Sequence, residues 1–256
     1  MKIDFHAHVW NTQLDQVDEF TERVAALGID KAVVLPIAPY MTNESIVELV
    51  KRGEGRIVGF ASVVPFAQTT GIPREDPIET LGHAIETLGL SGLKLHPLIQ
   101  GFSLDDPGLV PVVSAAGDLG VPVLFHTGPA NGRAGRLANG HLDLLDDLAI
   151  MCPNTVLVAG HANPMDNAVY LARKHPNVYL ETSISWARWG ALIPGLVRAT
   201  VEEAGPDKVL YGTDFSLGRD QRVRDTDAVF EAAGLSDEHL AMVHGGNAAR
   251  LLRLDV

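Results

Sequence analysis

The chain has 256 residues, of which 46% are hydrophobic and 20% are charged, a composition that excludes a mostly disordered protein. Its formal net charge of −12 argues against a general affinity for nucleic acid, whose phosphates such a surface repels. We therefore expect a single globular domain over residues 1–256 that acts on a small molecule and has no nucleic-acid partner.

Short apolar runs rich in β-branched residues recur along the chain and predict strands. In chain order, they begin at these residues: Ile3, Lys31, Ile57, Gly92, Pro122, Thr155, Asn177 and Val209. Between them lie helical patterns, among them 14–28, 44–53, 109–120 and 166–175, in which apolar residues return every three or four positions. The alternation predicts parallel strands joined by crossover helices.

Eight such units in this length favour a closed (β/α)₈ barrel, the TIM barrel of the α/β class, over an open doubly wound sheet. No GxGxxG follows the first strand, which argues against dinucleotide binding. Reactive groups of such a barrel lie at the C-terminal ends of the strands, because the loops there surround its mouth. Polar residues that end apolar strands are therefore the candidates for chemistry.

The first strand carries two histidines in the run DFHAH. Side chains alternate across a strand, so Asp4, His6 and His8 are expected on one face, which looks into the barrel. Two rings on one face can converge on one divalent cation, with the aspartate deeper behind them. Polar residues end four later strands in the same way: His96, His126, His161 and Asp214. A single strand-end histidine is often structural, but the repetition indicates a site.

The segments DFHAH, VLFHTG, VAGHAN, YGTDFS and HGGNAARLLRL together resemble the amidohydrolase superfamily, and within it the amidohydrolase-2 branch of metal-dependent hydrolases and decarboxylases. The resemblance implies that His6, His8, His126 and Asp214 bind one divalent metal, Zn²⁺ or alternatively Mn²⁺. It implies that His161 is a nearby acid/base and that Asp214 orients or deprotonates a water molecule. Exchanged roles for His126 and His161 stay open, because both end neighbouring strands.

Four residues are candidate substrate contacts: Lys94, His96, Arg133 and Trp186. Lys94 shares a strand face with His96 and is interpreted as an ordinary ammonium that binds a substrate carboxylate or pairs with an acidic residue. The alternative is the carboxylated lysine that supports a second metal in related binuclear enzymes. Arg133, in a glycine-rich loop after the fifth strand, suits an anionic group or is a solvated loop residue. Trp186 lies three residues before Trp189, and either lines a pocket or packs its helix.

The leading hypothesis is hydrolysis of a small amide or lactone by a metal-activated water molecule. The alternative is a non-oxidative decarboxylase of an aromatic or unsaturated carboxylic acid, although this chain is shorter than such decarboxylases usually are. The intact ligand set argues against a third hypothesis, a non-enzymatic binding barrel. The family resemblance also implies a homodimer.

Cysteine usage and the start of the chain bear on location. The lone Cys152 cannot form an internal disulfide, and Met1 runs straight into a strand-like segment without a basic region and a long apolar core. No stretch approaches the roughly 20 apolar residues that span a bilayer. These features predict a cytoplasmic protein with no membrane partner.

Overall fold

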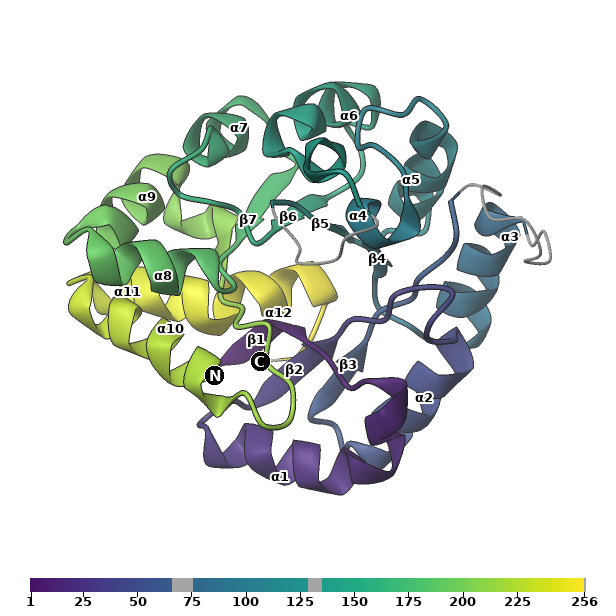
Figure 1. Ribbon diagram of the computed structural model, residues 1–256, viewed down its shortest axis with the longest axis horizontal. Helices are drawn as coiled ribbons and strands as arrows, with labels where there is room; N and C mark the ends of the chain where they lie inside the picture. The colour runs from purple at the N-terminus through teal and green to yellow at the C-terminus, as the bar shows by residue number, and fades with distance from the viewer. Residues whose placement is uncertain (66–75, 129–134, 256) are drawn as a thin grey trace.

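The computed structural model describes residues 1–65, 76–128 and 135–255 (Figure 1). Each predicted strand run holds a strand that lies wholly within it. The strands are β1 Ile3–Ala7, β2 Lys31–Val34, β3 Ile57–Gly59, β4 Leu93–Leu95, β5 Val123–His126, β6 Leu157–Gly160, β7 Val178–Glu181 and β8 Val209–Leu210.

The strands pair in sequence order and all pairs are parallel. β1, β2 and β3 form one ladder, and β4 to β8 form a second. Two parallel bridges join the ladders: Ala61 pairs with Leu93, and Ala7 pairs with Phe215 after β8. The eight strands therefore close into a ring, with the helices outside it (Figure 1). The predicted (β/α)₈ TIM barrel is confirmed, whereas the single domain over residues 1–256 stays a prediction.

The helices include all four segments that the apolar spacing predicted. They are α1 Val17–Ala26, α2 Asn43–Arg52, α3 Pro77–Gly82, α4 Pro97–Gln100, α5 Leu109–Asp118, α6 Leu145–Met151, α7 Ala168–Lys174, α8 Ser185–Leu192, α9 Leu196–Ala204, α10 Asp220–Ala232, α11 Asp237–Ala241 and α12 Asn247–Leu252. Within the described residues, no helix combines the length and the hydrophobicity needed to cross a membrane.

Strand side chains alternate between two apolar layers. In β4, Leu93 and Leu95 belong to the large cluster beneath the surrounding helices. Lys94 between them is in register with Leu124, which belongs to a smaller cluster inside the barrel. Helix α12 packs against this inner cluster and closes one end of the barrel, where the Asn247 amide donates to two backbone carbonyls at 2.8 Å.

The first strand departs from strict alternation. The register of β1 on β2 shifts between Asp4 and Ala7, which is the mark of a β-bulge. Neighbouring residues of a regular strand point to opposite faces, so Phe5 and His6 would be expected on different sides of β1. At the bulge, Phe5 nevertheless packs edge-on against Phe60 in the inner cluster. Asp4 ties β1 to the segment after β8, because it accepts hydrogen bonds from the Thr213 hydroxyl at 2.5 Å and the Thr213 N–H at 3.0 Å. Burial raises the pKa of this carboxyl to about 7.

Candidate metal centre

Histidines from three strand ends meet at the mouth of the barrel. The ring centroids of His6 and His8 are 5.2 Å apart, those of His6 and His161 are 4.5 Å apart, and those of His126 and His161 are 4.4 Å apart. Asp214 faces them from the segment after β8, with Oδ1 3.1 Å from His8 Nε2 and 3.9 Å from His6 Nε2. The structure thus brings together five residues that the sequence predicted for one site.

The hydrogen bonds of His6 in β1 and of His8 just after it leave one nitrogen of each ring free to bind a cation. His8 Nδ1 lies 2.8 Å from the Leu35 carbonyl, which can only accept, so the lone pair of His8 is on Nε2. His6 Nδ1 lies 2.7 Å from Glu181 Oε2, and His6 Nε2 is buried without a hydrogen-bond partner among the described residues. Two imidazole lone pairs therefore face a carboxylate, an arrangement that calls for a cation between them.

His6, His8 and Asp214 have ligand atoms that all lie within 4.8 Å of one another. Burial lowers the pKa of His6 well below its usual value, which keeps the ring neutral. Burial raises the pKa of Asp214, but the hydrogen bond with His8 and the neighbouring His8 and His6 rings hold it below its usual value. Imidazole nitrogens together with an ionised carboxylate are a donor set that suits zinc or manganese, so these residues fit a divalent metal.

A second group with the same spacing consists of His6, His161 and Glu181. It suits a cation less well, because both oxygens of Glu181 already accept hydrogen bonds. His126 belongs to neither group, but its Nε2 is buried and has no hydrogen-bond partner in the part of the chain that the structure describes. The role of His126 as a metal ligand stays a prediction.

Asp214 has an additional partner that the sequence did not predict. Arg222 of α10 donates from Nη1 to both Asp214 Oδ2 and the Asp214 carbonyl. The two carboxylate oxygens thus have separate neighbours, with Oδ1 towards the histidines and Oδ2 towards the guanidinium. Nothing in the local sequence indicated Arg222, because it lies in the helix after the strand-end loop.

A pocket of about 380 Å³ opens over this cluster. Its apolar wall consists of Trp10, Ile37, Ile99, Ile184 and Trp189. Three arginines also line it: Arg188, Arg219 and Arg222. The chain as a whole has a formal net charge of −12, so a group of three arginines at one place is unusual for it. Their positive charge favours an anionic ligand at the mouth of the barrel.

Of the predicted substrate contacts, His96 lies in the pocket lining and Lys94 does not. His96 is the N-cap of α4, where its Nδ1 accepts from the Ile99 N–H at 3.3 Å, and its ring stacks on His126 with centroids 3.9 Å apart. Lys94 is fully buried inside the barrel, and burial lowers its pKa to about 7. Its charge nevertheless lowers the pKa of His6 and of His126, and its Nζ has no hydrogen-bond partner among the described residues, so Lys94 lies close beneath the histidines. The contact with a substrate carboxylate stays a prediction. Arg133 lies outside the described residues.

Trp186 packs its helix against the core, which is one of the two alternatives that the sequence left open. Its side chain is fully buried, its indole N–H donates to the Ala162 carbonyl at 2.7 Å, and its ring stacks on Phe230 with centroids 6.2 Å apart. Trp189, three residues further along α8, lines the pocket instead. Both side chains share one side of the helix, and the packing of α8 against α10 decides which of them enters the core.

These positions predict different effects for the two tryptophans. Trp186→Ala leaves a cavity in the core and is expected to lower the free energy of unfolding by about 3–5 kcal/mol. Trp189→Ala is expected to leave stability nearly unchanged and to raise KM, because it removes part of the pocket wall. Chemical denaturation and steady-state kinetics on both variants test this; equal loss of stability in both would contradict the placement.

Sequence reasoning missed Glu181 and Ser183, which lie behind the histidines. Both are fully buried, and Glu181 is the last residue of β7. A signal was present, because Glu181 is a polar residue at the end of an apolar strand, like the histidines that were selected.

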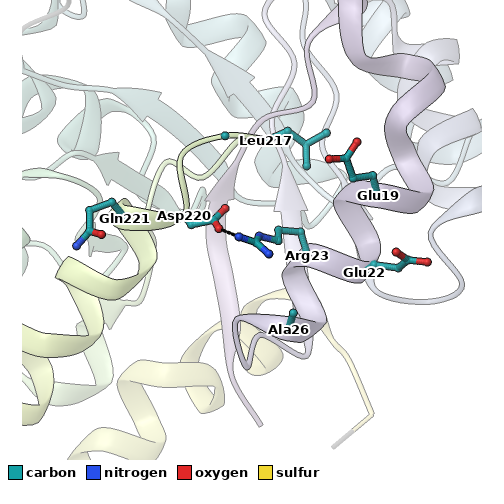
Figure 2. A pocket seen from close by; sticks show the side chains of 8 residues that line it. Glu19, Glu22, Arg23, Ala26, Leu217, Asp220 and Gln221 are labelled. Carbon is teal, nitrogen blue, oxygen red and sulfur yellow. Dashed lines mark hydrogen bonds and ion pairs between the residues drawn. The ribbon is translucent and has the colours of Figure 1, made fainter.

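A larger cavity, about 630 Å³, lies away from the histidines, between α1 and the start of α10 (Figure 2). Its lining includes Glu19 and Glu22, and Arg23 there forms an ion pair with Asp220. Its lining residues include no strand-end histidine, so the smaller pocket is the candidate active site.

A family model described as amidohydrolase matches residues 3–254. The chain belongs to the amidohydrolase family. The match covers nearly the whole barrel and places it in the amidohydrolase-2 branch, as the sequence motifs predicted. It is therefore an enzyme of a metal-dependent family, and the His6, His8 and Asp214 group is consistent with this.

One curated relative of this amidohydrolase is 2-amino-3-carboxymuconate-6-semialdehyde decarboxylase of Dictyostelium discoideum. It is 33% identical over 92 residues, which are 36% of this chain and only 24% of the relative. The similarity is therefore confined to a minor part of that enzyme.

Solved structures resemble this amidohydrolase over nearly its full length. An uncharacterised TIM-barrel protein of Bordetella bronchiseptica has a TM-score of 0.74 at 19% identity, covering 99% of this chain and 98% of its own. The 2,6-dihydroxybenzoate decarboxylase from Rhizobium has a TM-score of 0.70 at 17% identity, covering 100% and 99%. A probable 2-pyrone-4,6-dicarboxylic acid hydrolase from Acinetobacter baumannii has a TM-score of 0.68 at 16% identity, covering 98% and 99%. At such identities the likeness shows the shared fold.

Proposed function

We propose that this amidohydrolase removes CO₂ non-oxidatively from an unsaturated or aromatic carboxylic acid in a metal-dependent reaction. The observation that carries the proposal is a pocket that combines a metal-binding group with three arginines and an apolar wall. The relative that is 33% identical over 92 residues is a decarboxylase, and so is the Rhizobium enzyme with the same fold. Both similarities support the proposal.

His6, His8 and Asp214 would hold the metal, and His126 is a further candidate ligand. A divalent metal bound there supplies a Lewis acid that polarises a substrate oxygen and lowers the pKa of a water molecule. Arg188 and Arg219 supply positive charge that attracts and orients the substrate carboxylate, since Arg222 already pairs with Asp214. Trp10 and Trp189 offer flat apolar surfaces to an unsaturated skeleton.

In decarboxylation, the bond between the carboxylate carbon and its neighbour breaks, CO₂ leaves, and the neighbouring carbon keeps the electron pair and takes a proton. His161 lines the pocket, and burial lowers its pKa to about 3, so its resting ring is neutral. We assign to it the transfer of one proton per turnover from solvent to that carbon. The apolar wall keeps other water molecules away from the reacting carbon.

Hydrolysis of a small lactone or amide, the leading hypothesis from sequence, is the second candidate. It is favoured by the ionised Asp214 beside His8, which is placed to take a proton from an attacking water molecule. The fold neighbour from Acinetobacter baumannii is a probable hydrolase. Chain length does not separate the two reactions, because the decarboxylase and the hydrolase both align over nearly their whole chains.

A substrate panel distinguishes the two reactions. We expect the zinc- or manganese-loaded enzyme to release one CO₂ per molecule of an aromatic or unsaturated acid consumed, with 2,6-dihydroxybenzoate among the acids tested. A lactone such as 2-pyrone-4,6-dicarboxylate, incubated with the enzyme in H₂¹⁸O, tests hydrolysis, because oxygen from water would then enter the product. A product that retains every carbon and gains ¹⁸O, with no CO₂ from any acid, would contradict decarboxylation and support hydrolysis.

A further inference from the structure

We infer that Glu181 and Ser183 are positioning residues that set the tautomers of His6 and His161, and thereby decide which ring nitrogens face the pocket. The inference rests on the proposed function, in which His6 binds the metal and His161 moves the proton. Both positioning side chains are fully buried, behind the residues that line the pocket. They act through the rings and not on the substrate.

Glu181 accepts hydrogen bonds from four groups. Two are backbone donors, the Ser183 N–H at 2.5 Å and the His161 N–H at 3.1 Å, and a third is the Ser183 hydroxyl at 2.7 Å. The fourth neighbour is His6 Nδ1 at 2.7 Å. Because the carboxylate oxygens act as acceptors here, the proton of His6 lies on Nδ1 and its lone pair lies on Nε2, towards His8 and Asp214.

Ser183 links Glu181 to His161 by hydrogen bonds that run in the same direction, from the ring towards the carboxylate. Its hydroxyl proton is directed at Glu181, so its oxygen is left to accept from His161 Nδ1, which lies 2.9 Å away. The Ser183 carbonyl, an acceptor only, lies 3.3 Å from the same nitrogen. His161 therefore carries its proton on Nδ1, and the lone pair on Nε2 is available to take up a proton in the pocket. One carboxylate thus orients both rings.

The space around Glu181 favours this single arrangement. A Cβ at Gly212 would overlap Glu181 Oε1, so the chain after β8 closes directly over the carboxylate. The opposite tautomer of His6 would direct Nε2–H at the proposed metal position and remove a ligand. Loss of such a partner behind a ligating histidine typically lowers metal affinity about 10–100-fold.

The test is a titration of chelator-treated apo-protein with Zn²⁺ against a competing indicator. In Glu181→Gln, an amide of the same size places an NH₂ donor against groups that are themselves donors. We expect zinc affinity to fall about 10–100-fold. Ser183→Ala is expected to lose turnover with a smaller fall in zinc affinity than Glu181→Gln, because the Glu181 contact with His6 Nδ1 at 2.7 Å remains and only the longer Ser183 Oγ contact at 3.3 Å is lost.

Thr182→Val is the matched control. Thr182 is a buried neighbour on the same chain segment, and its hydroxyl donates to the Gly212 carbonyl at 3.1 Å. We expect it to keep wild-type zinc affinity. An equal loss in Thr182→Val and Glu181→Gln would assign the effect to packing and overturn the inference.

A second measurement reads the tautomers directly. ¹⁵N chemical shifts of the imidazoles in labelled apo-protein, assigned with His6→Gln and His161→Gln, are expected to show Nδ1–H on both rings. An Nε2–H tautomer in the wild type, or wild-type zinc affinity in Glu181→Gln, would overturn the inference and leave the proposed function standing. A wild-type protein that binds neither zinc nor manganese would instead contradict the proposed function.

Discussion

Replacing His8 with alanine is expected to abolish tight metal binding and to lower turnover by at least about 10³-fold, since a bound metal supplies several kcal/mol of transition-state stabilisation. His8 offers a lone pair on Nε2 because the Leu35 carbonyl holds Nδ1, and it belongs to the metal-binding group with His6 and Asp214. The measurement is elemental analysis of metal per chain in protein purified without chelator, together with kcat.

Lys94→Met is the control for this prediction. Lys94 is buried inside the barrel and is not one of the predicted metal ligands, so this variant is expected to keep the wild-type metal content. Full metal occupancy in His8→Ala would contradict the assignment of His8. About two metals per wild-type chain, falling when Lys94 is replaced, would instead indicate a binuclear centre with a carboxylated lysine.

The second large effect is expected for Asp214→Asn. The amide keeps the size of the side chain but removes the charge that faces His8 and pairs with Arg222. We expect kcat to fall roughly 10²–10⁴-fold, because the substitution removes the charged ligand from a metal centre that supplies several kcal/mol of transition-state stabilisation, with little change in Tm. Steady-state kinetics and thermal unfolding on metal-loaded protein measure both.

Asp225→Asn is the matched control for Asp214→Asn. Asp225 is an exposed carboxylate on the same helix as Arg222, and it accepts a hydrogen bond from Gln221 at 2.7 Å. It has no contact with the strand-end histidines and is expected to leave kcat unchanged. A fall in kcat of less than about threefold in Asp214→Asn would exclude Asp214 from the chemistry.

The barrel was predictable because each strand carries its own local pattern. Apolar runs alternate with helical spacing along the whole chain, and parallel strands bring their C-terminal ends to one mouth. His6, His8, His126, His161 and Asp214 could therefore be assigned to one place without knowing any distance. The bulge in β1 was not predictable, because it depends on the pairing with β2.

Other features depend on tertiary packing that no local pattern encodes. Trp186 and Trp189 lie on one side of α8, and only its contact with α10 decides which of them lines the pocket. Arg222 reaches Asp214 because α10 folds back over the loop after β8. Glu181 could have been predicted from the sequence, because it is a polar residue at the end of an apolar strand, as the selected histidines are.

Anomalous X-ray diffraction at the zinc edge, on crystals of the zinc-loaded protein, tests the central claim most directly. The account predicts a peak between His6 Nε2, His8 Nε2 and Asp214 Oδ1, at about 2.0–2.2 Å from each. A peak at Glu181 and His161 instead, or no peak in the barrel mouth after loading, would contradict it.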